Sequence, residues 1–399
     1  MSLNTTPSSE RLHIGFFGCR NAGKSSLVNA VTNQDLAVVS EVKGTTTDPV
    51  SKAMEILPLG PVVIIDTPGF DDAGNLGDLR VRRTKQILNK TDIAVLVVDA
   101  SVGMRDEDRQ LLALFREKQI PHLTVYNKCE LLPAVPEQTA DCIWVSAAEK
   151  IHIFELRELL GKLAPKEDPN RRIVGDLLRP EHQVVLVCPI DEAAPKGRMI
   201  LPQVQTIRDV LDAGCHALVT RELELAALLN ALKTPPALVI TDSQALAVVS
   251  KVTPEEVPLT TFSILMARYK GFLATAVAGI ARAKDLKEGD TVLMAEGCTH
   301  HRQCSDIGTV KIPRLLQKYT GCSLKFETCS GTEFPEDLSP YAMVIHCGAC
   351  MNTDRDVQYR MKCAVDQNVP FTNYGITLAQ MTGTLERSLR PLPAIHALL

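Results

Sequence analysis

The segment "GCRNAGKS" (18–25) constrains the fold of this chain more than any other stretch. It fits the pattern G-x-x-x-x-G-K-[ST] and lies between an apolar run, "LHIGFFG" (12–18), and a helix-like run, "KSSLVNAVT" (24–32). In this strand–loop–helix setting the pattern binds nucleotide phosphates, because backbone N–H groups and the helix N-terminus favour an anion. The sequence therefore predicts a phosphate-binding βαβ unit at the start of the chain.

The residues of this loop have separate expected roles. Gly18 and Gly23 let the backbone wrap around the phosphates. Lys24 is expected to reach the β- and γ-phosphates and Ser25 to hold Mg²⁺. Ser26 follows at the start of the same helix, and we include it among the cofactor-binding residues.

Two further segments supply the residues that are expected to bind the metal and to sense the γ-phosphate. The run "DTPG" ends the next apolar strand, where Asp66 can bind the water shell of the metal and the Gly69 amide can sense the γ-phosphate. The run "GTTTDP" precedes it and can close a threonine hydroxyl onto Mg²⁺. We favour Thr46 for this role, with Thr45 and Thr47 as alternatives.

The guanine base is expected at two later strand ends. The run "NKCE" provides Asn127, Lys128 and Glu130, in the pattern of a guanine-reading Asn-Lys-x-Asp. The run "SAA" provides Ser146 and Ala147, which are similar to the final guanine loop. All these segments follow one another in the order that a nucleotide-hydrolysing domain requires.

Together these segments resemble the GTPases of the Era and TrmE type, which implies GTP, GDP and Mg²⁺ as ligands and hydrolysis of GTP to GDP and phosphate. The sequence departs from that pattern twice. Glu130 stands where the family has Asp, and Phe70 stands where Ras-like enzymes place the glutamine that orients water. An apolar residue there implies slow intrinsic hydrolysis. In the resembling GTPases an asparagine at the position of Asn21 helps to hold K⁺, which can supply the charge of an arginine finger.

The rest of the chain predicts an α/β protein of three domains. The first segment continues with apolar runs at 61–69, 93–101, 121–128 and 142–148, which favour a parallel sheet covered on both faces. A charged, proline-containing linker follows at 165–172. The expected domains are a P-loop GTPase domain with a mostly parallel sheet at 1–168 and two smaller α/β domains at 175–262 and 263–399.

The second segment lacks a phosphate loop and any polar constellation, so we interpret it as a packing or assembly domain. Its helix-like run 203–214 places Val204, Ile207 and Leu211 on one face. The chain shows no internal sequence repeat.

Two segments in the last domain carry soft metal ligands. The runs "AEGCTHHRQC" and "HCGAC" each end a predicted strand, and such ends share one edge of a parallel sheet. Three thiolates with one imidazole suit Zn²⁺, whereas three thiolates alone also suit a 4Fe–4S cluster with one open iron. The residues themselves leave both metals open. The candidates are Cys298, His300, Cys304, His346, Cys347 and Cys350.

The spacing Cys-x-His, then His-Cys-x-x-Cys, downstream of an Era-like GTPase resembles the HydF family, scaffold GTPases for the maturation of FeFe hydrogenase. The resemblance covers the whole chain and implies a 4Fe–4S cluster held by Cys298, Cys347 and Cys350. It also implies a homodimer through the central domain, a two-iron precursor bearing CO and cyanide, and apo FeFe-hydrogenase and radical-SAM maturases as partners. His300 and His346 are each expected either as a fourth ligand or as a donor that supports the ligands.

Glu296, Cys304 and an exogenous group are further candidates for the fourth cluster position. A solvated loop carboxylate is the preferred interpretation of Glu296, and Cys304 is a spare thiol on the same loop.

The charge and apolar content of the chain limit the classes of partner that it is expected to have. The net charge is −4 and no long run of Lys or Arg is present, which argues against nucleic acid as the main partner. The longest apolar stretches, 93–98 and 272–281, are too short to span a bilayer, and the N-terminus lacks the apolar core of a signal peptide. We therefore expect a cytoplasmic protein with reduced thiols and no membrane partner.

Two other functions compete with a scaffold for hydrogenase maturation. One is an Era/TrmE-like GTPase in RNA modification or ribosome assembly with a zinc-stabilised C-terminal domain. The other is a GTPase regulated by a metal or redox sensor.

Overall fold

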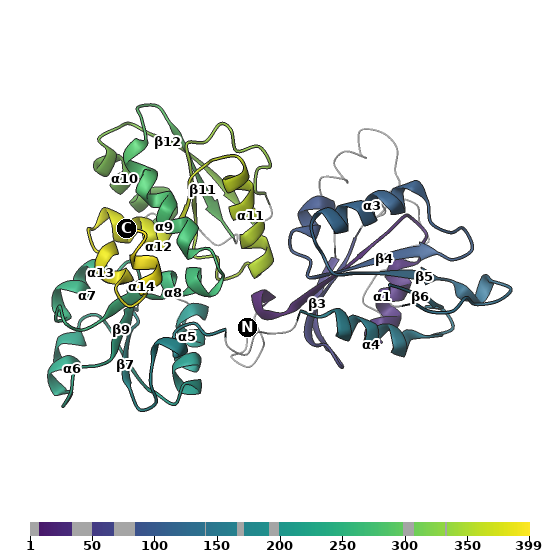
Figure 1. Cartoon of the computed structure of the whole chain (residues 1–399), viewed down its shortest axis with the longest axis horizontal. Helices are drawn as coiled ribbons and strands as arrows, with labels where there is room; N and C mark the ends of the chain where they lie inside the picture. The colour runs from purple at the N-terminus through teal and green to yellow at the C-terminus, as the bar shows by residue number, and fades with distance from the viewer. Residues whose placement is uncertain are drawn as a thin grey trace. The chain divides into compact units, whose positions relative to one another are not determined.

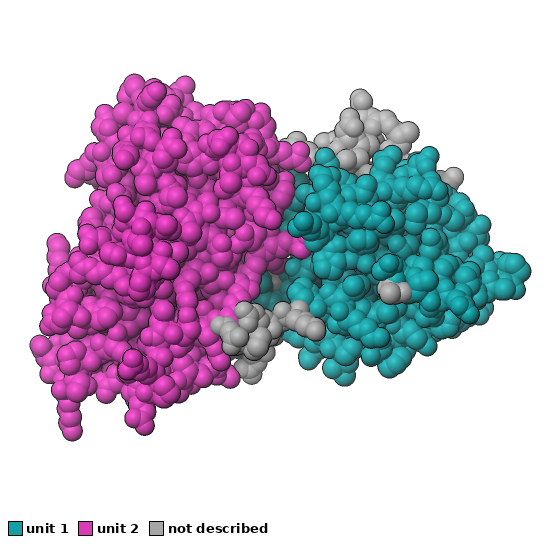
Figure 2. Space-filling view, viewed as in Figure 1, with its two compact units in different colours: residues 1–167 teal, residues 168–399 magenta. Residues whose placement is uncertain are grey.

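The computed structural model describes residues 8–33, 50–67, 84–139, 141–165, 171–190, 199–297, 307–331 and 333–399. The chain divides into two compact units, residues 1–167 and 168–399 (Figure 1; Figure 2). Within the described ranges, no helix is both long and apolar enough to cross a lipid bilayer.

The first unit contains a six-stranded sheet in the order β2-β3-β1-β4-β5-β6. Only β2 runs antiparallel to its neighbour, and the other strand pairs are parallel. The strands are β1 (Leu12–Phe17), β2 (Val50–Ile56), β3 (Gly60–Asp66), β4 (Ile93–Asp99), β5 (His122–Asn127) and β6 (Cys142–Val145). The described helices include α1 (Lys24–Thr32), α3 (Asp106–Glu117) and α4 (Ile153–Leu163), with short 3-10 helices η1 (Ser8–Glu10) and η2 (Cys129–Leu131).

Alternate residues of the central strands enter two separate cores. Ile14 and Phe16 of β1 pack with Leu27 of α1 on one face of the sheet. Phe17 joins Phe115 of α3 on the other face. Burial on both faces explains why these strands are continuous apolar runs. The carboxyl ends of the parallel strands lie along one edge, where ligands bind in open α/β sheets.

The second unit contains two four-stranded sheets. The first has the order β10-β9-β7-β8 and the second β12-β11-β13-β14, and all their pairs are parallel. The first sheet comprises β7 (Gln183–Val187), β8 (His216–Thr220), β9 (Leu238–Thr241) and β10 (Leu259–Thr261). The second comprises β11 (Thr291–Glu296), β12 (Lys325–Ser330), β13 (Met343–His346) and β14 (Phe371–Asn373).

Helices connect these strands or follow the last of them. Those of the first half are α5 (Leu201–Asp212), α6 (Leu225–Ala231), α7 (Leu246–Val252), α8 (Phe262–Tyr269) and α9 (Leu273–Ala281). Those of the second half are α10 (Ile312–Thr320), α11 (Asp354–Asp366), α12 (Tyr374–Met381), α13 (Leu385–Leu389) and α14 (Pro393–His396). The shorter turns are η3 (Gly175–Leu177), η4 (Arg282–Asp285) and the π-helical η5 (Ile307–Lys311).

The two sheets repeat one topology. Counted along the chain, each has its second strand at one edge, then its first, third and fourth. In both halves a side chain at the end of the fourth strand caps the next helix: Thr261 accepts from the Ile264 amide, and Asn373 accepts from the Ile376 amide. A helix of each half also packs on the sheet of the other half: α9 packs on β14, and α13 packs on β10. One continuous apolar core therefore joins both halves of this unit.

Helix α5 does not bury the whole apolar face that its sequence indicates. Val204 and Leu211 are exposed by 40% and 55%, whereas Thr206 and Asp209 are buried. The Asp209 carboxylate accepts the backbone N–H groups of Val174 at 2.8 Å and Gly175 at 2.7 Å. A polar side chain of the helix therefore forms hydrogen bonds inside the unit. Ile207 packs against the core, so the face that carries the three apolar residues is only partly buried.

Candidate functional site

The phosphate loop joins β1 to α1 in the first unit. The side chain of Lys24 is only 8% exposed, and its Nζ donates to the carbonyl oxygens of Gly18 at 3.0 Å and Cys19 at 2.8 Å. Gly18 and Gly23 have φ of 142° and 85°. A Cβ at either glycine would lie 2.2 Å from a neighbouring atom, so both positions require glycine.

Ser25 and Asp66 meet at the carboxyl ends of β1 and β3. The Ser25 hydroxyl donates to Asp66 Oδ2 at 2.6 Å. Within the described residues, the other carboxylate oxygen of Asp66 is buried and has no hydrogen-bond partner. Burial raises the pKa of Asp66. A hydroxyl beside a carboxylate with an unused oxygen fits the hard oxygen ligands that Mg²⁺ prefers.

Asn127 connects three parts of the site. Its Nδ2 donates to the Ala22 carbonyl at 3.1 Å, and its Oδ1 accepts the backbone N–H of Ala147 at 3.0 Å. The end of β5 is thereby tied to the phosphate loop and to the loop after β6. The sequence predicted Asn127 only as a reader of the base, and this cross-link follows from the sheet order.

The other residues that the sequence predicts to read the base lie around this cross-link. Lys128 forms an ion pair with Asp99 at 2.5 Å, a partner that the sequence analysis did not identify. Glu130 Oε2 is buried without a hydrogen-bond partner among the described residues, so an acceptor is present at this position. The Ser146 hydroxyl is buried and accepts the Glu149 amide at 3.0 Å.

Asn21 and Ser26 are exposed on the phosphate loop and the start of α1, and Asn21 has a φ of 61°. Several other predicted site residues lie outside the described residues, so their positions are not part of this geometry. They are Thr45, Thr46, Thr47, Gly69, Phe70, Cys298, His300 and Cys304.

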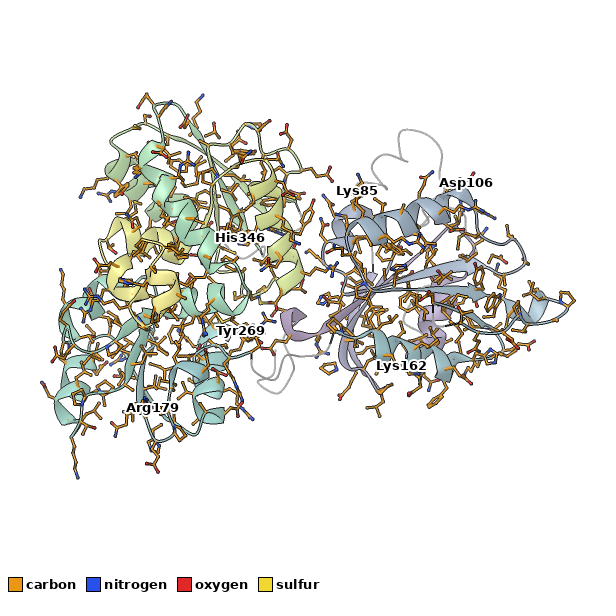
Figure 3. The ribbon with its side chains drawn as sticks, in the orientation of Figure 1. Lys85, Asp106, Lys162, Arg179, Tyr269 and His346 are labelled. Atoms are coloured by element: carbon orange, nitrogen blue, oxygen red, sulfur yellow. The ribbon has the colours of Figure 1, made fainter. Side chains whose placement is uncertain are left out.

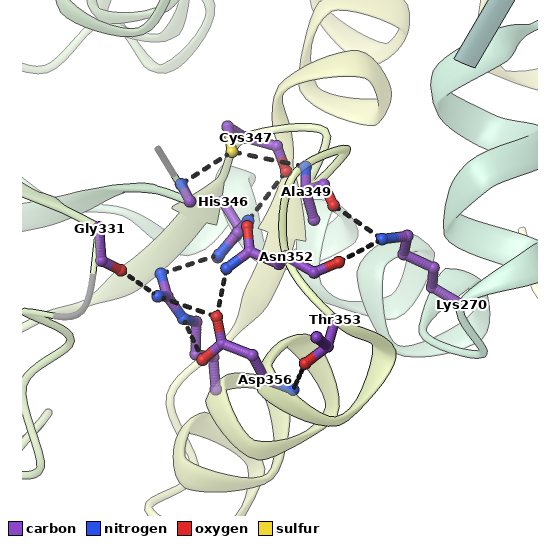
Figure 4. Close-up of polar contacts among 10 residues, drawn as sticks. Lys270, Gly331, His346, Cys347, Ala349, Asn352, Thr353 and Asp356 are labelled. Carbon is purple, nitrogen blue, oxygen red and sulfur yellow. Dashed lines mark hydrogen bonds and ion pairs between the residues drawn. The ribbon is translucent and has the colours of Figure 1, made fainter. Parts of the chain in front are cut away.

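The cysteine-containing turn follows β13 in the second unit. Strand β11 pairs with β13 in register, with Ala295 opposite His346. The Cys347 sulfur accepts the backbone N–H of Gly297 at 3.1 Å and that of Ala349 at 3.4 Å (Figure 4). Hydrogen bonds of this kind are made to the sulfurs of iron–sulfur ligands. Burial raises the pKa of the Cys347 thiol to about 11, so binding a metal there must release a proton.

His346 is fully buried, and both of its ring nitrogens have partners (Figure 4). Nε2 lies 3.2 Å from Nη1 of Arg360, and Nδ1 lies 2.9 Å from the Cys347 carbonyl oxygen. A guanidinium can only donate, so Nε2 accepts and Nδ1 carries the proton. Burial, followed by the charge of Arg360, lowers the pKa of His346 to about 3. The neutral imidazole therefore holds the backbone of Cys347 by donating its Nδ1 proton to the Cys347 carbonyl oxygen.

A buried network holds Arg360 in place. Its guanidinium forms an ion pair with Asp356 at 3.2 Å and donates to the Gly331 carbonyl. Asn352 donates to the same Asp356 carboxylate. The spacing of Asp356 and Arg360, four residues apart on a helix, was available in the sequence, but nothing there indicated that the pair would be buried beside His346.

The other ligand candidates are distributed unevenly. Cys350 is half-buried, and burial raises the pKa of its thiol. Glu296 is buried at the end of β11 and accepts from the Tyr374 hydroxyl at 3.3 Å, so it is not a solvated loop carboxylate. Among the described residues, no group of three or more His, Cys, Asp or Glu side chains is placed to hold a metal ion.

The neutral state of His346 predicts how stability depends on pH. Its folded pKa lies below the value of 6.5 for an unfolded histidine, so the unfolded chain takes up a proton first as the pH falls. In cluster-free, reduced protein, the stability that His346 contributes is complete above about pH 6.5 and is lost toward pH 3. Between pH 7.5 and 5.0 the loss should be about 2 kcal/mol.

Urea unfolding of the wild type and of His346→Gln, followed by circular dichroism, measures this loss. The difference in unfolding free energy between the two proteins should shrink as the pH falls from 7.5 to 5.0. A difference that stays constant would show that His346 does not resist protonation.

Three family models match this chain. The model of a 50S ribosome-binding GTPase matches residues 13–128. The model described as the hydrogen maturase F dimerization domain matches residues 173–271. The model described as the hydrogen maturase F tetramerization domain matches residues 274–391, which contain both β11 and β13.

Curated relatives match over part of their length. The tRNA modification GTPase MnmE of Thiobacillus denitrificans is 37% identical over 156 residues, covering 39% of this chain and 34% of the relative. The GTPase Der of Kosmotoga olearia is 30% identical over 178 residues, covering 40% of each protein. The chain thus spans about a third of the length of the first relative.

Solved GTP-binding proteins are similar to part of the chain. A crystal structure of Aquifex aeolicus Era bound to GDP and AlF4− has a TM-score of 0.35 and 19% identity, covering 52% of this chain and 93% of Era. A crystal structure of a probable GTP-binding protein engB has a TM-score of 0.32 and 22% identity, covering 38% of this chain and 97% of that protein.

Proposed function

The chain belongs to the hydrogen maturase F family of GTPases, and from this we propose that it is a GTP-hydrolysing scaffold for the maturation of FeFe hydrogenase. It would bind a 4Fe–4S cluster and a two-iron precursor and deliver the precursor to apo FeFe-hydrogenase. The observation that carries the proposal is the position of Cys347 and Cys350 directly after β13, beside the end of β11, in the segment that the tetramerization model matches.

In this proposal Cys298, Cys347 and Cys350 hold the cluster. When bound, it supplies one iron without a protein thiolate, a position that an exchangeable group can take. The backbone N–H groups of Gly297 and Ala349 stabilise the Cys347 thiolate by donating to it. The hydrogen bonds of His346 support assigning it to holding the backbone rather than to the fourth ligand position.

The nucleotide site would act as a switch rather than in the cluster chemistry. Lys24 would bind the β- and γ-phosphates, while Ser25 and Asp66 would hold Mg²⁺ and its water shell, with Thr46 and the Gly69 amide responding to the γ-phosphate. The base would be read by the asparagine, lysine and glutamate after β5 and by the loop after β6. Loops that order around the γ-phosphate would determine whether hydrogenase or a radical-SAM maturase docks.

We propose that copies of this chain associate through the first half of the second unit. The dimerization model matches this segment, and β8 is an edge strand of its sheet. Val204, Leu211 and Val219 are exposed on α5 and β8. An edge strand beside exposed apolar side chains favours pairing with another chain. We place the assembly in the cytoplasm, where its thiols stay reduced.

Anaerobic reconstitution with iron and sulfide tests the proposed function. The protein should turn brown, contain iron and sulfide in equal amounts, and activate apo FeFe-hydrogenase when loaded with the two-iron precursor. The alternative is an RNA-modification GTPase with a zinc-stabilised C-terminal domain, which the similarity to tRNA modification GTPases favours. Colourless protein with stoichiometric zinc and no activation of hydrogenase would support that alternative.

GTP hydrolysis should be faster in K⁺ than in Na⁺, and Asn21→Ala should remove the difference. Phe70 cannot orient water, so the charge that develops in the transition state needs a cation near the phosphate loop. Phosphate release at matched ionic strength in the two salts measures the effect. Equal wild-type rates in both salts would exclude a role for K⁺.

A further inference from the structure

Lys270 is a buried cation beside the cysteine-containing turn. It directly follows α8, and its side chain is 4% exposed. Its Nζ donates to the carbonyl oxygens of Ala349 at 2.8 Å and Asn352 at 2.7 Å (Figure 4). These two carbonyls flank Cys350 along the chain, so the ammonium holds both sides of that residue.

A second contact fixes the backbone of Lys270 to the same half of the unit. Gln358 of α11 donates to the Lys270 carbonyl at 2.5 Å. The Asp354 carboxylate at the start of α11 lies 3.9 Å from Lys270 Nζ, within ion-pair distance. Asp354 is also paired with Arg171. Lys270 is therefore placed by its main chain as well as by its side chain.

Burying an ammonium is costly unless acceptors replace its hydration. Here two carbonyl oxygens and a nearby carboxylate favour the charged form. Burial is still the largest influence on the pKa of Lys270, which it lowers, and the charge of Lys270 counteracts the effect of burial on the pKa of Cys350. A buried ammonium of this kind suits a site that carries negative charge.

We propose that Lys270 is a positioning residue for the cluster, through which the dimerization segment holds the turn between Cys347 and Cys350 and places a fixed positive charge beside it. Lys270 lies within residues 173–271, whereas the two cysteines lie within residues 274–391. The cluster site is thus completed by a residue of the neighbouring segment. This inference rests on the proposed cluster at these cysteines.

The fixed charge has a measurable consequence. Reduction adds one negative charge to a cluster, so a buried cation beside the ligands stabilises the reduced form. Lys270→Met keeps much of the side-chain volume but removes the charge and both hydrogen bonds. Its reduced-to-oxidised ratio at a fixed potential should fall by at least tenfold, equivalent to about 59 mV for a one-electron couple. Lys270→Arg should restore most of the wild-type potential.

The experiment is a dithionite redox titration of the reconstituted full chain, followed by EPR, with iron and sulfide measured on each sample. Lys251→Met is the matched control, because Lys251 is exposed at the end of α7. Its potential should equal that of the wild type. Lys270→Met with full iron content and an unchanged potential would overturn the inference.

Asp354→Asn provides a variant with the opposite expected sign. It removes a negative charge near Lys270 without removing the hydrogen bonds of the ammonium, so the potential should rise. A general loss of structure would not shift the two variants in opposite directions. If Lys270→Met fails to fold, an unchanged potential in Asp354→Asn overturns the inference. A wild type that binds no iron would instead overturn the proposed function.

Discussion

Replacing Cys347 or Cys350 with alanine is expected to strip the cluster or leave it incomplete. Three thiolates have no redundancy, and Cys347 in addition loses the sulfur that accepts two backbone N–H groups. Because outer partners of a metal ligand alone contribute ~10–100-fold to affinity, removing a ligand should weaken binding by at least that factor. Iron and sulfide per protomer, with EPR of the reduced protein, measure the loss.

Cys329→Ala is the matched control for these variants. Cys329 lies on β12 opposite Ala295 of β11, so it is a half-buried thiol on a strand beside the one that leads to the site. It should keep the full cluster. The ligand variants should hydrolyse GTP near the wild-type rate but fail to activate apo-hydrogenase. Full iron content in either ligand variant would show that this turn does not hold the cluster.

Variants of the other predicted ligands separate their roles. Cys298→Ala should behave like the two variants of the turn. His300→Ala and His346→Ala should retain a 4Fe–4S signal with an altered line shape. A Cys298 variant with a full cluster and full maturation activity would identify Cys304 or another thiol as the third ligand.

Lys24→Ala is expected to reduce GTP hydrolysis by ~10²–10³-fold, the usual cost of removing a group that stabilises developing charge. The Lys24 ammonium is held inside the phosphate loop by two carbonyl oxygens, and no second buried lysine of the described loop can replace it. Phosphate release under saturating GTP measures the rate. Lys162→Ala is the control, because that lysine is exposed on α4 (Figure 3).

Iron content should stay unchanged in Lys24→Ala and in Ser25→Ala. The phosphate loop belongs to the first compact unit and the cysteine-containing turn belongs to the second. Each site is built from residues of its own unit. Loss of iron in either variant would contradict this independence.

Much of the first unit follows from local sequence. The apolar runs that end in "DTPG" and "NKCE" form β3 and β5, because strands buried on both faces must be continuously apolar. The phosphate loop is recognisable because its glycines have backbone angles that other residues avoid. Short strands are harder to predict from the sequence. Strands β10 and β14 have three residues each, too few to show a hydrophobic periodicity.

The second unit shows where local pattern fails. Its two sheets share one topology, although the chain shows no internal sequence repeat. Strand order depends on which strands pair, and many residue choices satisfy the same pairing. The spacing of the apolar residues on α5 does not set its orientation, because Val204 and Leu211 are exposed. Asp209 instead finds two buried amide donors, which lie more than thirty residues away in the chain.

The sequence by itself indicated a phosphate loop, predicted residues that bind the metal and read the base, and predicted cysteines spaced for one metal centre. Only the tertiary structure decided which groups surround them. The bonds from Arg360 to His346 and from Lys270 to Ala349 join residues 14 and 79 positions apart. Burial makes these polar contacts obligatory, since a buried charge must find partners. Burial is a property of the packed chain, so no local spacing can reveal it.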